Sequence, residues 1–295
     1  MIKTIKEALI WASSYLKNQG IENPYTESQL LLKKLLDLPL VKLTLQENQP
    51  LTEQQLENYL QWVKKRGEGY PYAYIIKGKE FMGLEFYVDP RVLIPRPETE
   101  ILVEWAISYI ELNKISDFKI VDVGTGSGAI GISLAKYTGK KIYAVDLSMD
   151  SLQVAKLNSE KLGVADKIKF YHGNLLKPLK KQGLEVDLVV SNLPYIPERE
   201  YATLQREVKE FEPYTALIGG ETGLEIYQEL VQQLKGTLKK GGALAIEIAY
   251  NQGQRAIDHL QKGGFQKTYI LNDLAGHQRV VIGENFIGEN FKNYV

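Results

Sequence analysis

Apolar residues recur every three or four positions through the first part of the chain, a spacing that predicts helices without strands. The first segment places its apolar side chains on one helical face: Ile5, Leu9, Ala12 and Leu16. Thr52 and Gln55 have the spacing of a capping box, which predicts the start of a further helix. Residues 1–76 are therefore predicted to form an N-terminal helical domain.

The pattern changes at residues 77–96, where GKEFMGLEFYVDPRVLI alternates polar and apolar residues around Met82-Gly83. Alternation with a period of two indicates β-strands, and a glycine at the centre indicates a turn between them. We expect a β-hairpin here that joins two domains.

From residue 97 onward, apolar strand patterns alternate with helical ones. Strands are expected within 119–124, 141–148, 167–173, 186–192 and 242–248, and helices within 129–137, 149–162, 223–239 and 252–262. This alternation predicts an α/β fold with a parallel sheet covered on both faces. The stretches 268–273 and 278–284 follow each other closely, so one edge should be antiparallel. Residues 97–295 thus read as a Rossmann-like catalytic domain.

Composition narrows the class of protein. Lys plus Arg and Asp plus Glu both number 36, so no net charge favours bulk binding to nucleic acid. The absence of cysteine excludes disulfides, thiolate metal sites and a cysteine nucleophile, and no metal site is expected. Charged residues interrupt the amphipathic start of the chain, unlike a signal peptide, and we see no membrane span. We expect a cytoplasmic monomer.

The stretch VDVGTGSG is a strand that runs into a glycine turn and then a helix. Its residues Gly124, Thr125, Gly126, Ser127 and Gly128 are candidate cofactor contacts, since glycine lets a ligand approach the backbone. The turn alone does not choose the cofactor, because the GxGxxA pattern of dinucleotide enzymes also fits here.

Polar residues at successive strand ends favour S-adenosylmethionine. A fixed carboxylate at Asp122 would repel a pyrophosphate and attract the ammonium group of the methionine end. Asp146 ends the next strand, where a carboxylate can accept hydrogen bonds from both ribose hydroxyls. Asn174 can bind the adenine edge, with Leu175 against the adenine face.

After the fourth strand, VVSNLPYIPERE turns sharply through Asn192, Leu193, Pro194 and Tyr195. The Asn192 side-chain oxygen and the Leu193 carbonyl can each accept one N–H of a planar NH₂ group. Tyr195 can lie against the flat face of the acceptor, and Pro194 stiffens the turn. We interpret this corner as a methyl-acceptor site beside the cofactor's methyl group, with Asn192 and Tyr195 as the catalytic candidates and Asn192 also as a cofactor contact.

These motifs resemble a known family. DVGTGSG, the later acid Asp146 and the Asn-x-Pro-Tyr corner look like class I methyltransferases that modify planar nitrogens. LIPRPETE (93–100) and FEPYTALIGGETGLEIY (211–227) are more specifically similar to bacterial release factor glutamine methyltransferases. The resemblance implies methylation of the glutamine amide in the Gly-Gly-Gln motif of peptide chain release factors, which act in translation termination. It also implies that the N-terminal helices help to dock this protein substrate.

One residue departs from the family pattern, which usually reads Asn-Pro-Pro-Tyr where this chain has Leu193. Leucine still supplies a carbonyl, but the rigidity of the corner is open. The Asn-Leu-Pro-Tyr corner is also similar to that of ribosomal RNA adenine dimethyltransferases. A nucleic-acid adenine methyltransferase and a glutamine methyltransferase for a ribosomal protein therefore stay open as alternatives. The neutral charge, the PRPETE motif and the helices at the front favour release factors.

Overall fold

The computed structural model describes residues 2–288. The chain divides into two compact units. The first comprises the residues up to Gly78 together with Gln205–Phe211, and the second comprises Lys79–Leu204 and the chain from Glu212 onward. Residues 289–295, which the sequence pattern assigned to the catalytic domain, lie outside the described part.

The first unit is helical within the described residues. Its helices are α1 (Ile5–Asn18), α2 (Pro24–Leu36), α3 (Leu40–Leu45), α4 (Glu53–Gly67), α5 (Tyr72–Ile76) and α10 (Arg206–Phe211). The capping box at the start of α4 is confirmed, because Thr52 Oγ1 accepts from Gln55 N and Gln55 Oε1 accepts from Thr52 N. The apolar faces of α1, α2 and α4 form one core that includes Leu16, Leu31 and Val63.

Helix α10 comes from far along the chain, and the sequence pattern did not assign it to this unit. Arg66 on α4 is 9% exposed and binds two carboxylates, with Nε 2.9 Å from Glu27 Oε2 and Nη1 2.8 Å from Glu207 Oε2. The Tyr70 and Phe211 rings pack edge to face with centroids 5.0 Å apart. A charged and an aromatic contact therefore attach α10 to the helices of the first unit.

The second unit is built on a mostly parallel sheet, as predicted. Its strands lie in the order β10-β11-β9-β6-β3-β4-β5. Their bounds are β3 (Ile120–Val123), β4 (Ile142–Asp146), β5 (Ile168–His172), β6 (Val186–Ser191), β9 (Leu238–Glu247), β10 (Phe265–Asn272) and β11 (Gln278–Phe286). Neighbours from β5 to β9 pair in parallel, while β11 pairs antiparallel with both β9 and β10. The predicted antiparallel edge is confirmed.

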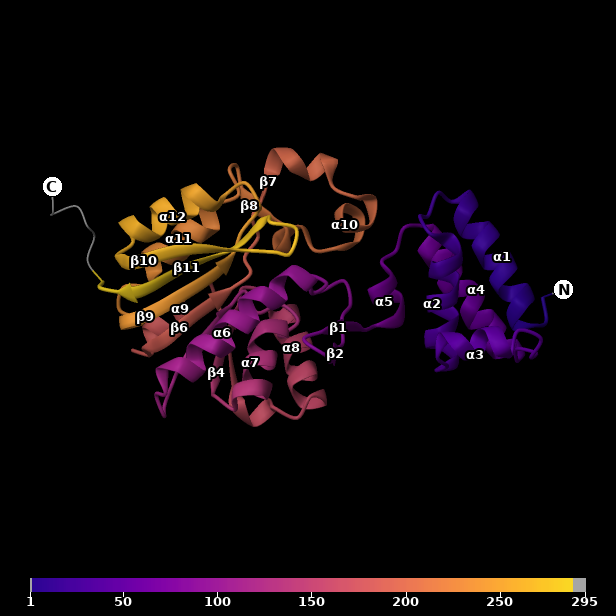
Figure 1. Ribbon diagram of the computed structural model, residues 1–295, viewed down its shortest axis with the longest axis horizontal. Helices are drawn as coiled ribbons and strands as arrows, with labels where there is room; N and C mark the ends of the chain where they lie inside the picture. Colours follow the sequence, from indigo (N-terminus) through magenta and orange to yellow (C-terminus); the bar gives the residue numbers. More distant parts are fainter. Residues whose placement is uncertain (1, 289–295) are drawn as a thin grey trace. The chain divides into compact units, whose positions relative to one another are not determined.

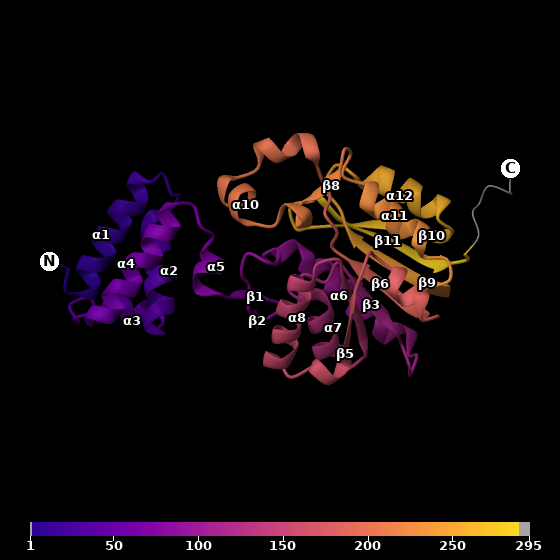
Figure 2. The same ribbon diagram turned by 180° about the vertical axis from the view of Figure 1, so that it is seen from behind.

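Helices cover both faces of this sheet (Figures 1 and 2). One face carries α6 (Glu100–Asn113), α7 (Ala129–Thr138) and α8 (Met149–Lys161), and the other carries α9 (Lys177–Lys181), α11 (Glu225–Gln233) and α12 (Gly253–Lys262). Side chains alternate along each strand, so that Val189 belongs to one core while Leu188 and Val190 belong to the other. All six residues of β6 are buried, as expected for a central parallel strand.

The hairpin consists of β1 (Lys79–Phe81) and β2 (Leu84–Phe86), which pair antiparallel. Met82 and Gly83 at its turn both have positive φ, the combination that suits a two-residue hairpin loop. Phe81 and Phe86 are buried in the core under α6 and α7. The hairpin is thus part of the second unit, and strand pairing ends at Phe86, although the alternating pattern continues.

One helix prediction was too long. The helix expected over 223–239 ends at Gln233, and β9 already begins at Leu238. Gly236 has a φ of +81°, which terminates the helical path before the strand. Two short parallel strands, β7 (Ile196–Pro197) and β8 (Ile218–Gly220), were not expected and form a separate two-stranded sheet.

Candidate active site

The candidate site lies where the strand order reverses. The chain runs from β3 outward to β4 and β5 and then returns to β6 on the other side of β3. Such a reversal opens a crevice at the carboxyl ends of the strands, where open α/β sheets bind ligands. Ser191 at the end of β6 donates its hydroxyl to the Val123 carbonyl of β3 at 2.5 Å. The two central strand ends are therefore tied together.

The glycine turn follows β3 and folds over the end of β4. Gly124, Gly126 and Gly128 have φ values of +72°, +55° and +84°, a region that other residues rarely adopt. The N–H groups of Gly124 and Thr125 donate to the Val145 carbonyl at 2.8 and 3.0 Å. These bonds fix the turn at the mouth of the crevice.

Asp122 is completely buried beneath this turn. Its Oδ2 accepts from Thr125 Oγ1 at 2.6 Å and from Gly131 N at 2.9 Å, while Oδ1 has no partner within residues 2–288. Burial raises the pKa of Asp122 to about 6. The carboxyl group thus holds the turn and the first turn of α7, and it can act on a ligand through its charge.

Asp146 lies half-buried at the end of β4. Its Oδ2 accepts from Gly126 N and its Oδ1 from Ser148 N, both at 2.8 Å. Burial raises the pKa of this carboxyl, and the backbone hydrogen bonds oppose that rise. A carboxylate has about four acceptor positions, so two remain for further hydroxyl groups. Leu147, the next residue, exposes 68% of its surface at the same edge.

Asn174 follows β5, and its Nδ2 donates to Glu229 Oε1 at 3.0 Å. Anchoring the nitrogen in this way leaves the carbonyl oxygen of the amide to accept a hydrogen bond. Leu175 is only 6% exposed and packs in the core under α11. Little of its surface can face a ligand, whereas Leu147 offers an exposed apolar side chain.

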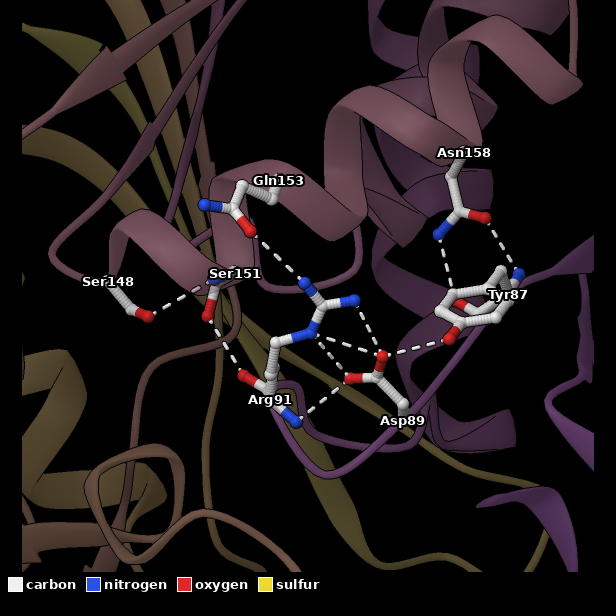
Figure 3. Close-up of polar contacts among 7 residues, drawn as sticks. All are labelled: Tyr87, Asp89, Arg91, Ser148, Ser151, Gln153 and Asn158. Atoms are coloured by element: carbon white, nitrogen blue, oxygen red, sulfur yellow. Dashed lines mark hydrogen bonds and ion pairs between the residues drawn. The ribbon is translucent and has the colours of Figure 1, made fainter. Parts of the chain in front are cut away.

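A polar cluster joins the segment after the hairpin to α8 (Figure 3), and its residue Asn158 also binds the glycine turn. The buried Asn158 donates to the Ser127 carbonyl at 2.8 Å and to the Tyr87 carbonyl at 2.9 Å, and it accepts from Tyr87 N at 2.7 Å. Nearby, Arg91 pairs with Asp89, with Nη2 2.6 Å from Oδ2. The segment after the hairpin is thereby fixed to both α8 and the turn.

The acceptor corner, residues 192–195, is fixed by hydrogen bonds from its side chains to other segments. Asn192 Nδ2 donates to Glu247 Oε2 at 2.9 Å and to Thr99 Oγ1 at 3.0 Å. These two bonds use both amide hydrogens, so Oδ1 faces away from Glu247. Within residues 2–288, neither Asn192 Oδ1 nor the Leu193 carbonyl accepts a hydrogen bond.

Tyr195 is fixed at two of its polar groups. Its hydroxyl donates to Glu247 Oε1 at 3.2 Å, and its carbonyl accepts from Gln252 Nε2 at 2.9 Å. Glycines pack against the corner, because a Cβ on Gly219 would stand 2.3 Å from the Pro194 carbonyl oxygen. A Cβ on Gly223 would stand 2.2 Å from the Tyr195 carbonyl oxygen. This packing explains the GGETG stretch in the sequence.

The structure adds three residues that sequence reasoning missed: Thr99, Glu247 and Gln252. Glu247 ends β9, is 3% exposed and accepts from Thr99 Oγ1 at 2.5 Å in addition to its bonds with the corner. Burial raises its pKa to about 7. A lone acid within the apolar strand GALAIEI was the signal that could have drawn attention to it.

Two charged residues of the PRPETE segment hold neighbouring parts of the chain and do not bind the acceptor corner directly. Arg96 Nη2 lies 2.5 Å from Glu212 Oε1, and Ile94 N donates to Glu212 Oε2 at 3.1 Å. Glu100 accepts from Met82 N at 2.6 Å, so it anchors the hairpin turn. The residue of this motif that reaches the acceptor corner is Thr99.

Among residues 2–288, no group of three or more His, Cys, Asp or Glu side chains is arranged to hold a metal ion. None of the helices described is both long and apolar enough to cross a membrane.

Both parts of the chain match known protein families. Residues 7–76 match the family described as the PrmC N-terminal domain, and residues 114–283 match one described as a methyltransferase domain. The N-terminal domain of human METTL16, solved in complex with SAH, superposes with a TM-score of 0.50 at 17% identity. The match covers 81% of this chain and 86% of that one, and shows the shared fold. The fold and the strand-end site define a class I methyltransferase.

Relatives of known activity place the chain more narrowly. A release factor glutamine methyltransferase of Clostridium acetobutylicum is 40% identical over 279 residues, covering 94% of this chain and 97% of that relative. One of Bacillus cereus is 38% identical over 285 residues, covering 95% of this chain and 99% of that relative. The chain belongs to the release factor glutamine methyltransferase family.

Proposed function

We propose that this protein transfers a methyl group from S-adenosylmethionine to the side-chain amide of the Gly-Gly-Gln glutamine in peptide chain release factors. One observation carries the proposal. The free acceptors at the corner, Asn192 Oδ1 and the Leu193 carbonyl, match the two N–H groups of a primary amide. Family membership supports the choice of release factors as the substrate.

In this proposal the cofactor binds across the strand ends. The turn from Gly124 to Gly128, including Thr125 and Ser127, carries the methionine end, and the buried Asp122 attracts its ammonium group through charge. Asp146 accepts from the ribose hydroxyls. Asn174 presents its amide oxygen to the adenine amino group, while Leu147 covers the adenine face more fully than Leu175 can. Asn192 would then stand beside the sulfonium methyl group.

The chemistry needs placement more than acid–base catalysis. The amide nitrogen forms a bond to the methyl carbon as the carbon–sulfur bond breaks, S-adenosylhomocysteine leaves, and one N–H proton is released to water. The nitrogen lone pair is delocalised into the carbonyl, so attack makes the nitrogen more tetrahedral and more positive. Two acceptors on its hydrogens stabilise that change, and Tyr195 and Pro194 hold the amide so that its flat face, from which the lone pair projects, is directed at the methyl group.

We further propose that the helical unit, residues 1–78 with 205–211, helps to dock the release factor. The zero formal net charge supports a protein substrate over a nucleic acid, which would require a basic surface. We propose a monomer in the cytoplasm, where release factors act.

Label transfer from S-adenosylmethionine tests the function directly. Purified release factor, ribosomal RNA and DNA are offered in parallel, with a release factor whose loop glutamine is replaced as the matched control. We expect label on the intact release factor alone. Labelling of RNA alone, or equal labelling of the control, would overturn the proposal.

A further inference from the structure

Glu247 is a buried carboxylate without an ion-pair partner in residues 2–288. All of its hydrogen-bond partners are neutral donors, and they come from two separate segments: Thr99 from one, and Asn192 and Tyr195 from the other. Such a group is costly to bury, and proteins usually pair it with a cation. Here, each partner instead belongs to the acceptor corner or to the motif that supports it.

The charge of Glu247 decides the orientation of the Asn192 amide. An ionised carboxylate only accepts hydrogen bonds, so it requires the Nδ2 group of Asn192 to point toward it. The oxygen then points to the acceptor position. A neutral amide at position 247 could donate as well as accept, which would also permit the reverse orientation. In that orientation Asn192 would present N–H groups to the substrate's own N–H.

We propose that Glu247 is the positioning residue of the acceptor site: it fixes Asn192 and Tyr195, and its negative charge compensates the positive charge that develops on the acceptor nitrogen. This inference rests on the proposed function. Glu247 is one hydrogen bond behind Asn192, so it acts by polarising that amide and increasing the negative charge on Oδ1. In a site with few mobile dipoles, this effect is larger than in water.

Charged groups around Glu247 set the pH at which this role is lost. Burial raises the pKa of Glu247 to about 7, and the charge of Glu98 contributes to the rise. The hydrogen bonds from Thr99 and Tyr195 and the charge of Arg279, which is itself paired with Asp273, oppose it. Below that pH the carboxyl group carries a proton, and the orientation of Asn192 is no longer enforced. In a pH profile of kcat/KM for release factor, the acidic limb should therefore have its midpoint near pH 7, with activity decreasing below that pH.

Glu247→Gln tests the proposal with little change in volume. We expect kcat to fall about 100-fold, comparable to the loss of one pre-organised polar group in other enzymes. The affinity for S-adenosylmethionine, measured by calorimetry, should change less than threefold, which also shows that the variant is folded. A variant that keeps kcat within threefold would overturn the proposal. The wild-type protein is assayed beside the variant. If the wild type leaves release factor unlabelled, the proposed function is wrong; if the wild type is active and the variant equally so, only the role of Glu247 is wrong.

Two further variants move the acidic limb in opposite directions, which a purely structural role would not do. Thr99→Val removes a donor to the carboxylate and should shift the limb to higher pH. Glu98→Gln removes a neighbouring negative charge and should shift it to lower pH. If both limbs coincide with that of the wild type, Glu247 does not control the reaction and the proposal is wrong.

Discussion

Gly124 lies directly against the side chain of Leu193, since a Cβ added to Gly124 would stand 3.1 Å from Leu193 Cδ2. The same atom would be 3.8 Å from the Asn192 carbonyl oxygen. The cofactor turn and the acceptor corner are therefore in contact. Leu193, which replaces the usual proline of the family, is 6% exposed and belongs to the core under α11.

This contact gives a prediction about Leu193. Leu193→Ala should lower the free energy of unfolding by about 2–4 kcal/mol, because it leaves a cavity beside the turn. Its kcat should stay within a few-fold of wild type, since the backbone carbonyl is retained. Urea unfolding and steady-state kinetics measure the two effects. Leu193→Pro, which restores the residue usual in the family, is the control. If Leu193→Ala is folded but inactive, the argument that only the backbone carbonyl of residue 193 is needed is wrong.

Asn192→Ala separates binding of the amide from binding of the cofactor. We expect kcat to fall by about 100-fold or more, because the variant loses the acceptor Oδ1. Cofactor affinity should fall only modestly in calorimetry. Asn192→Asp is the matched control of equal size. It places a carboxylate against Glu247, so its stability should fall as the pH rises and both groups ionise. Near wild-type turnover of Asn192→Ala would show that the clamp is not used.

The fold could be predicted because its signals are local. The change from a period of three or four to alternating strands and helices marks the second unit, and the glycine turn marks the start of α7. The end of α11 was missed because Leu234 and Leu238 continue the apolar spacing on either side of Gly236, whose positive φ ends the helical path. Attachment of α10 to the first unit was also missed, because it depends on Arg66 contacting Glu207.

The site was only partly predictable for a related reason. Asn192 and Tyr195 follow a strand and form a recognisable local motif. The groups that hold them come from elsewhere: Thr99 is 93 positions from Asn192, and Glu247 is 55 positions away. Within PRPETE, charged residues are the usual candidates for a functional role, whereas it is the neutral hydroxyl of Thr99 that reaches the corner. Contacts at such separations become visible only in the folded chain.

Asp122→Asn should stabilise the protein at high pH and weaken cofactor binding. A folded-state pKa of about 6 against an ordinary value of 3.8 corresponds to on the order of 3 kcal/mol. Because the folded pKa is raised, the native state loses this stability as the pH rises from about 4 through 6. The variant should therefore be more stable than wild type by about 1–3 kcal/mol at pH 8, with the difference disappearing near pH 4.

Cofactor binding by the Asp122→Asn variant tests the functional role of the carboxylate. Affinity for S-adenosylmethionine should fall roughly tenfold, because the charge beneath the ammonium group is lost. Methylthioadenosine, which lacks that ammonium group, is the control ligand and should bind both proteins equally. An equal loss for the two ligands would show that Asp122 acts only by shaping the turn.

Asn158 should couple stability to cofactor affinity. Asn158→Ala leaves the Ser127 carbonyl and both backbone groups of Tyr87 without their partner. We expect a loss of about 2–4 kcal/mol in urea unfolding, together with weaker S-adenosylmethionine binding as the turn loosens. Arg91→Ala is the control from the same cluster (Figure 3). Its ion pair with Asp89 is partly exposed, so its loss should cost about 1 kcal/mol or less and leave cofactor affinity unchanged. Equal effects of the two variants on affinity would show that the whole cluster, and not the bond to Ser127, supports the turn.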